Sequence, residues 1–134
     1  MHVFPIRVYY EDTDAGGVVF YANYLKFMER ARTEWLRSKG YSQANLAVSD
    51  HIMFVVAELA MEYKAPARLD QELYIHTYIT QFGRASLHFA QQVFHQEELL
   101  AQGTIKVGCV HTQTLKIHPL PLSLLERIKS TDQE

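Results

Sequence analysis

The chain has very little of several features that mark particular classes of protein. Its single cysteine, Cys109, excludes an intrachain disulfide and lies in an apolar, alternating run typical of a small core residue. The 13 basic and 15 acidic residues nearly cancel, and no run of five like charges occurs. Because the charge pattern of a nucleic-acid-binding protein is missing, we expect no nucleic acid partner.

Long apolar stretches are missing as well. The apolar runs are only a few residues long, far short of the length that spans a bilayer. Pro5 and Arg7 interrupt residues 1–7 before the apolar core of a signal peptide can form. We therefore expect no membrane span and a cytoplasmic location.

Sites with known ligand or nucleophile spacings are also absent from the sequence. An EF-hand loop beginning at Asp12 would need an oxygen ligand at Gly16 and a glutamate at Asn23, so a calcium site fails at two positions. There is no His-x-x-x-His or Cys-x-x-Cys pair, nucleophile elbow, phosphate-binding loop or dinucleotide fingerprint. We expect neither a metal nor a cofactor. Histidines are scattered along the predicted strands: His76, His88, His95 and His111.

The residues that are present suit one folded unit. With 134 residues and 48% apolar content, the chain is near the commonest domain size and can build one hydrophobic core. We expect a single domain over residues 1–134.

The first third of the chain predicts a strand followed by the longest helix. Residues 3–10 are rich in β-branched and aromatic types, which favours a strand, and Gly16-Gly17 ends it. From Asn23, the expected N-cap, apolar residues recur at helical spacing until Gly40, which predicts a helix of about 15 residues. Its apolar face consists of Tyr24, Phe27, Met28, Ala31 and Trp35.

Residues 52–112 predict an antiparallel meander of four strands. Residues 52–57 are apolar at both parities, so we expect the first of these strands to be covered on both faces. A further short helix is expected over residues 122–128. The strands are expected to break at Lys64–Ala67, at Gly83-Arg84 and at Glu97-Glu98.

This order of elements predicts an α+β fold. An antiparallel sheet with one apolar face needs a cover, and the long helix is the one large enough to supply it. A single hotdog domain, in which a five-stranded antiparallel sheet wraps a long central helix, has this order. A ferredoxin-like or cystatin-like sheet with one helix shares it, so the pattern alone leaves three topologies open.

Carboxylates cluster between the first strand and the long helix, at Glu11, Asp12 and Asp14. One interpretation is a solvated turn whose side chains cap backbone amides. The other rests on residues 16–21, which are too apolar for an ordinary exposed loop and would tuck the turn into the protein. A carboxylate held there beside helix amides would stay ionised and face a carbonyl bound by those amides.

The same segment carries a family resemblance. From Tyr9 it reads Tyr-Tyr-Glu-Asp-Thr-Asp-x-x-Gly-Val-Val-x-Tyr-x-x-Tyr-x-x-Phe-x-Glu-x-Ala-Arg, which resembles the YbgC-like branch of the 4-hydroxybenzoyl-CoA thioesterase family. The members of this family are hotdog acyl-CoA thioesterases. The match is strong over residues 7–32 and continues to near residue 121, through Phe54-Val55-Val56 and Tyr63-x-Ala-Pro-Ala. The resemblance makes hotdog the favoured topology.

The resemblance implies roles for two residues. Asp14 would be the catalytic carboxylate, and the backbone amide near Tyr21 would polarise the thioester carbonyl at the start of the central helix. YbgC-like proteins often carry histidine where this chain has Tyr21, whereas the hydroxybenzoyl branch has tyrosine there, so the role implied here is that of the backbone amide. Asp12 and Glu11 would serve only to form the turn. The resemblance also implies that two protomers pair edge to edge, with active sites at their interface.

Thioester hydrolysis needs only a few groups. The leaving thiolate has a conjugate acid with a pKa of about 8 to 9, so it departs with little help from a general acid. Oriented amides stabilise the oxyanion, and losing one such donor costs roughly 2.7 to 4 kcal/mol. Asp14 would either attack the carbonyl to form a mixed anhydride or draw a proton from water. The predicted activity is hydrolysis of an acyl-CoA to a carboxylic acid and CoA.

Three further residues are expected near the substrate. Tyr10 would place its hydroxyl at the same pocket, with simple packing as the other interpretation. Arg84 aligns with a basic position near the CoA nucleotide in the hydroxybenzoyl branch, and Ser86 lies beside it. For both of these the other interpretation is a solvated turn.

Other functions and assemblies stay open at this stage. A non-catalytic module that binds acyl thioesters or a partner protein through the same cleft is the alternative function. A hotdog dehydratase is a weaker rival, because no histidine lies near the acidic turn or on the helix. The acyl group, the carrier (CoA or an acyl carrier protein) and the choice between homodimer and homotetramer are not fixed by the sequence.

Overall fold

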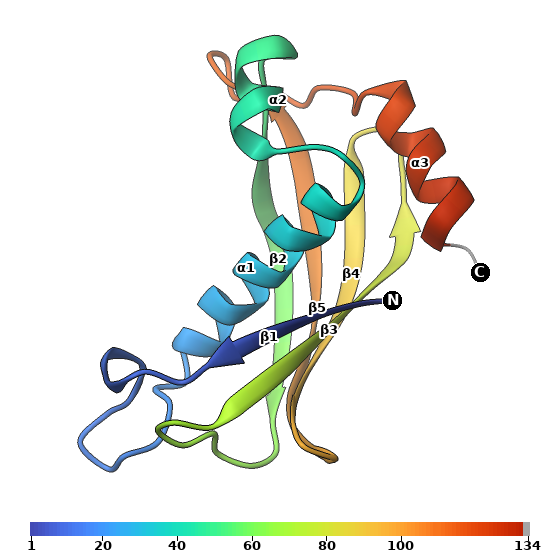
Figure 1. Cartoon of the computed structure of the whole chain (residues 1–134). Coiled ribbons are helices and arrows are strands. Elements are labelled where there is room, and N and C mark those ends of the chain that lie inside the picture. Colours follow the sequence, from blue (N-terminus) through green and yellow to red (C-terminus); the bar gives the residue numbers. More distant parts are fainter. Residues whose placement is uncertain (133–134) are drawn as a thin grey trace.

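A computed structural model of the chain describes residues 1–132. Five antiparallel strands form one sheet, and the long helix α1 lies across one face of it (Figure 1). The predicted α+β fold, with a five-stranded sheet around a long central helix, is confirmed. The strands are β1 (His2–Arg7), β2 (Ile52–Tyr63), β3 (Glu72–Phe82), β4 (Ser86–His95) and β5 (Glu98–His111). The helices are α1 (Asn23–Ser38), α2 (Gln43–Ser49) and α3 (Leu122–Asp132), and a 3-10 turn, η1, covers Tyr10–Asp12.

The strand order is β1-β3-β4-β5-β2, so the expected meander of four strands is wrong. Strands β3, β4 and β5 do pair in sequence, because short turns join them. β2 instead pairs with β5, from Ile52 opposite His111 to Tyr63 opposite Ala101. The segment 64–71 then carries the chain to the far edge, where β3 lies beside β1.

Helix α1 supplies the part of the core that covers the sheet. Phe27 and Met28 are fully buried on its sheet-facing side, as the apolar spacing predicts. Gly40 has a φ of +89° just after the helix, which confirms it as the stop. The expected N-cap is wrong, because Ala22 occupies that position and Asn23 is the first helical residue.

Two shorter helices follow. Helix α3 confirms the helix predicted near the end of the chain and extends beyond it. Helix α2 was missed within a polar stretch, although Ser42 accepts the Asn45 N–H at 3.2 Å as its N-cap and Leu46 is buried. No helix in residues 1–132 has the length and apolarity needed to cross a membrane.

Strand β2 forms one edge of the sheet. Val55, Val56 and Leu59 are 38%, 48% and 48% exposed. The expectation that this strand is covered on both faces is therefore wrong within residues 1–132, because Val55 and Val56 point to opposite faces of the sheet and both are exposed. An edge strand of this kind leaves unpaired backbone groups and apolar side chains for another chain to cover.

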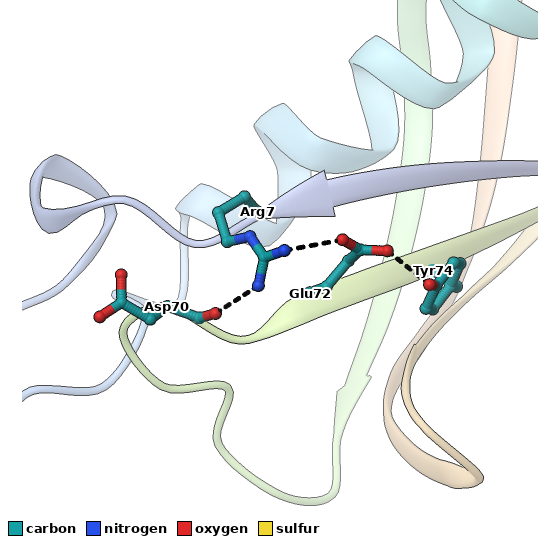
Figure 2. A network of polar contacts seen from close by, with 4 residues as sticks. All are labelled: Arg7, Asp70, Glu72 and Tyr74. Atoms are coloured by element: carbon teal, nitrogen blue, oxygen red, sulfur yellow. Dashed lines mark hydrogen bonds and ion pairs between the residues drawn. The ribbon is translucent and has the colours of Figure 1, made fainter.

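At the other edge, a polar network joins β1 to the turn that precedes β3. Figure 2 shows Arg7 donating to the Asp70 carbonyl at 2.7 Å and to the Glu72 carboxylate at 2.8 Å, while the Tyr74 hydroxyl donates to the same carboxylate. The Val8 N–H donates to the Gln71 carbonyl at 2.9 Å. These bonds fix the end of β1, from which the acidic turn departs.

Candidate active site

Asp14 lies at the start of a tight glycine turn. Its N–H donates to the Val18 carbonyl at 2.9 Å, and its carbonyl accepts the Gly17 N–H at 3.1 Å. Gly17 has a φ of +77°, a conformation that side-chain-bearing residues rarely adopt. The Asp14 Oδ1 accepts the Gly16 N–H at 2.8 Å, whereas Oδ2 has no hydrogen-bond partner within residues 1–132.

Asp12 differs from Asp14 in its surroundings. Asp12 is 5% exposed, and its carboxylate accepts the Tyr9 N–H at 2.8 Å and the Asn23 side-chain amide at 3.1 Å. Both of its oxygens are therefore used within the chain. Asp14 is exposed, so the structure separates one structural carboxylate from one accessible carboxylate.

The apolar segment after Asp14 does not tuck the turn inside, contrary to expectation. Val19 is buried in the core, but Phe20 and Tyr21 are 46% and 64% exposed. The buried Val19 side chain is enough to attach this segment to the core. The rings of Phe20 and Tyr21 lie beside each other on the surface, with centroids 4.7 Å apart.

The backbone at Tyr21 is held from both sides. The Phe20 carbonyl accepts the Asn23 N–H at 2.8 Å, and the Tyr21 carbonyl accepts the Tyr63 hydroxyl at 3.0 Å. In a trans peptide the N–H points opposite to the C=O, so the first bond aims the Tyr21 N–H away from the helix. None of the hydrogen bonds within residues 1–132 uses that N–H.

The segment after β2 supports this arrangement, and sequence reasoning gave it no role. The Ala67 carbonyl accepts the Val19 N–H at 2.8 Å, and the Ala67 N–H donates to the buried Tyr24 hydroxyl at 2.9 Å. Val18 and Arg68 form an isolated antiparallel bridge. The only signal for these contacts was the Tyr63-x-Ala-Pro-Ala stretch that contributed to the family resemblance.

The remaining predicted residues lie in two places. Tyr10 is in η1, next to the Asp14 turn, and is 82% exposed. Arg84 is exposed in the turn between β3 and β4, where its carbonyl accepts the Leu120 N–H at 2.8 Å. Ser86 is the first residue of β4, and its carbonyl accepts the Gly83 N–H at 2.9 Å.

The structure does not bring Arg84 and Asp14 together within one chain. The Asp14 turn borders the segment that leads into β3, through the bridge between Val18 and Arg68. Arg84 follows the other end of β3, which lies beside α3 in Figure 1, and it lines a pocket together with Leu122 and Leu125 of that helix. β3 contains 11 residues. At about 3.3 Å per residue, it separates the two sites by roughly 30 Å.

A cavity of about 290 Å³ lies between α1, α2 and the inner face of β2, β4 and β5. Its walls include Trp35, Phe54 and Phe89, together with Arg32. Burial lowers the pKa of the Arg32 guanidinium, and the charge of Glu29 opposes that shift. Arg32 lies roughly 16 Å along the helix from Tyr21, at 1.5 Å per residue, so this cavity is not where a carbonyl bound at Tyr21 would lie.

Metal ligands do not gather anywhere in the described part of the chain. Within residues 1–132, no group of three or more His, Cys, Asp and Glu side chains is placed to hold a metal ion. The polar groups that the structure places at the Asp14 turn include the Asp14 carboxylate and backbone amides.

Comparison with known proteins shows that the chain is similar to several thioesterases. A model of the thioesterase superfamily matches residues 16–102, beginning just after Asp14. The acyl-CoA thioester hydrolase YbgC of Escherichia coli O6:H1 is 47% identical over 126 residues, which cover 93% of each chain. The acyl-CoA thioesterase YbgC of Haemophilus influenzae is 41% identical over 127 residues, covering 95% of this chain and 90% of that protein. A solved 1,4-dihydroxy-2-naphthoyl-CoA thioesterase from Synechocystis, 25% identical, has a TM-score of 0.88 and covers 98% of this chain and 97% of its own.

Proposed function

The chain belongs to the thioesterase superfamily and is an acyl-CoA thioesterase, and we propose that Asp14 is its catalytic carboxylate and the Tyr21 N–H its oxyanion donor. One observation carries this proposal. Around a single glycine turn, an exposed carboxylate with one unheld oxygen precedes a helix-start amide that has no acceptor within residues 1–132.

The reaction adds water across the C–S bond, giving a carboxylic acid and free CoA. As the acyl carbon is attacked, negative charge grows on the thioester oxygen, and the Tyr21 N–H donates to it there. The N-terminus of α1 adds its partial positive charge to the same position. The thiolate then leaves and takes up a proton, with little need for a general acid.

Asp14 can act on the thioester by two mechanisms, and an experiment can distinguish them. As a nucleophile, its Oδ2 forms a mixed anhydride that water then hydrolyses. As a general base, the same oxygen takes a proton from the attacking water. A covalent acyl adduct on Asp14, caught by rapid quenching and mass spectrometry, marks the first route.

We also propose that the enzyme is a homo-oligomer built on a homodimer. Edge strand β2, with Val55, Val56 and Leu59 exposed, supports a pairing of sheets between two copies. The separation of Arg84 from Asp14 along β3 supports a site shared between copies. In this arrangement Arg84 and Ser86 of a second copy hold the CoA nucleotide, while Tyr10 borders the Asp14 turn.

A cytoplasmic location completes the proposal. Its support is chemical, since the one thiol of the chain, Cys109, is buried and free and needs no oxidising compartment.

Thiol release from a panel of acyl-CoAs tests the function, with Asp14→Asn as the decisive variant. We expect the variant to keep its circular dichroism spectrum and to lose at least roughly a hundredfold in kcat. Glu11→Gln is the matched control, because it neutralises an exposed carboxylate of the same loop and should leave kcat unchanged. A folded Asp14→Asn enzyme with the wild-type rate would refute the role of Asp14. Binding without release of any thiol by the wild type would instead indicate a binding module.

A further inference from the structure

Tyr63, the last residue of β2, reaches the start of α1. Its hydroxyl donates to the Tyr21 carbonyl at 3.0 Å, a contact between residues 42 positions apart. Tyr63 is also the first residue of the Tyr63-x-Ala-Pro-Ala stretch, which has no part in the mechanism proposed above.

The ring of Tyr63 is 44% exposed and is oriented by contacts with two other tyrosine rings. It lies edge-on to Tyr21, with centroids 6.4 Å apart, and packs against Tyr24, with centroids 5.3 Å apart. Tyr24 is itself held, since it is buried and its hydroxyl accepts the Ala67 N–H. Partial burial raises the pKa of the Tyr63 hydroxyl above its ordinary value, which extends the pH range over which the hydroxyl can donate.

Tyr63 completes the restraint of the backbone on both sides of the Tyr21 Cα. The Asn23 N–H holds the Phe20 carbonyl, and Tyr63 holds the Tyr21 carbonyl. The N-cap, Ala22, has no side-chain hydrogen bond of its own. The bond from the Asn23 N–H to the Phe20 carbonyl closes a four-residue turn whose middle peptide joins Tyr21 to Ala22. Without Tyr63, this middle peptide would lose the hydrogen bond that fixes its carbonyl, and the turn that orients the Tyr21 N–H would be less restrained.

We propose that Tyr63 is a positioning residue, whose hydroxyl holds the Tyr21 carbonyl and thereby keeps the Tyr21 N–H aimed at the thioester oxygen. This role rests on the proposed function of the Tyr21 N–H. An oxyanion donor acts most strongly where negative charge develops, so its misalignment is felt in the transition state more than in the bound substrate. The expected signature is a fall in kcat with little change in KM.

Tyr63→Phe tests this role, because it keeps the ring contacts and removes only the hydroxyl. We expect kcat to fall about tenfold while KM changes less than about twofold. In the nitrogen–proton NMR spectrum, the Ala22 amide should shift, because its peptide loses the hydrogen bond at the Tyr21 carbonyl. Tyr41→Phe is the matched control, since it removes a hydroxyl that hydrogen-bonds the Ser123 hydroxyl beyond the C-terminal end of α1, far from Tyr21. In this control variant, kcat and the chemical shift of the Ala22 amide should both be unchanged.

Several results would overturn the role of Tyr63. A folded Tyr63→Phe enzyme with wild-type kcat would do so even if the Ala22 amide shifts. A rise in KM at constant kcat would instead make Tyr63 a substrate contact. Failure of the proposed function is seen separately, as a wild-type enzyme without thiol release or as an active Asp14→Asn variant. If the Asp14→Asn variant is active, a tenfold loss of kcat in Tyr63→Phe would still support the Tyr21 N–H as the oxyanion donor and Tyr63 as its positioning residue.

Discussion

The Asn23 side-chain amide donates to the Asp12 carboxylate at 3.1 Å, linking the first residue of α1 to the last residue of η1. Asp14 lies two residues after Asp12, and Tyr21 lies two residues before Asn23. The single hydrogen bond between Asp12 and Asn23 therefore ties together the two chain segments that carry Asp14 and Tyr21. The contact sets the spacing across which a carboxylate and a helix-start amide can share one substrate.

Asp12→Ala removes this link and the buried carboxylate that accepts the Tyr9 N–H. We expect the free energy of unfolding to fall by about 1–3 kcal/mol, because two part-buried donors lose their acceptor. Urea unfolding followed by circular dichroism measures the change. Glu11→Ala alters the exposed neighbouring carboxylate and should stay within about 0.5 kcal/mol of the wild type. Equal effects of the two substitutions would mean that the Asp12 contacts contribute little.

Strand β5 approaches β2 closely at Gly103 but not at Gly108. Substituting alanine for these two glycines should therefore affect stability differently. A Cβ added at Gly103 would overlap the Met61 Sδ and lie 2.9 Å from the Ala60 carbonyl oxygen, so the edge strand has to shift. We expect Gly103→Ala to lower the unfolding free energy by about 1–3 kcal/mol.

Gly108→Ala is the control for that substitution. Its nearest neighbour would be the Val55 Cγ2 at 3.9 Å, an ordinary contact, so its melting temperature should stay close to that of the wild type. Similar melting temperatures for both variants would contradict the assigned crowding at Gly103.

Local patterns in the sequence predicted the elements that depend on local physics. Alternation along β3, β4 and β5 and the amphipathic spacing of α1 are visible in the sequence, because each reflects one buried face. The pairing of β2 with β5 is not visible, since it depends on how the whole sheet closes. Helix α2 was missed because a single buried leucine in seven residues gives almost no periodic signal.

The site divides in the same way. The family resemblance singled out Asp14 and the Tyr21 amide, while the burial of Asp12 depends on Asn23, a partner 11 positions away. The contact of Tyr63 with Tyr21 joins two segments 42 positions apart and has no local signature. The apolar residues Phe20 and Tyr21 were expected inside, because apolarity predicts burial without saying whether the same chain supplies the cover.

Burial of Cys109 predicts how stability depends on pH. Burial raises the pKa of the Cys109 thiol from 9.0 to about 11, so the folded protein keeps this proton more tightly than the unfolded chain. The resulting stabilisation is complete below pH 9 and is lost as the pH rises from about 9 to about 11. We expect the unfolding free energy of Cys109→Ala to change less over this window than that of the wild type. Parallel curves for the two proteins would show that the thiol does not contribute.

A mixing experiment tests the proposal that two copies of the chain share each substrate site. Arg84→Ala alone should raise KM for acyl-CoA but not for acyl-pantetheine, which lacks the nucleotide. Asp14→Asn alone should be inactive. In a mixed dimer of these two variants, one site combines both substitutions and the other contains neither, provided that each site takes Asp14 from one copy and Arg84 from the other.

Random reassortment of equal amounts of the two variants should therefore restore about one quarter of the wild-type sites, with wild-type KM. If one copy supplied both residues, every site in the mixture would carry one substitution, and no activity with wild-type KM would return. The length of β3 favours the first result, because its 11 residues keep Arg84 far from the Asp14 turn of the same chain.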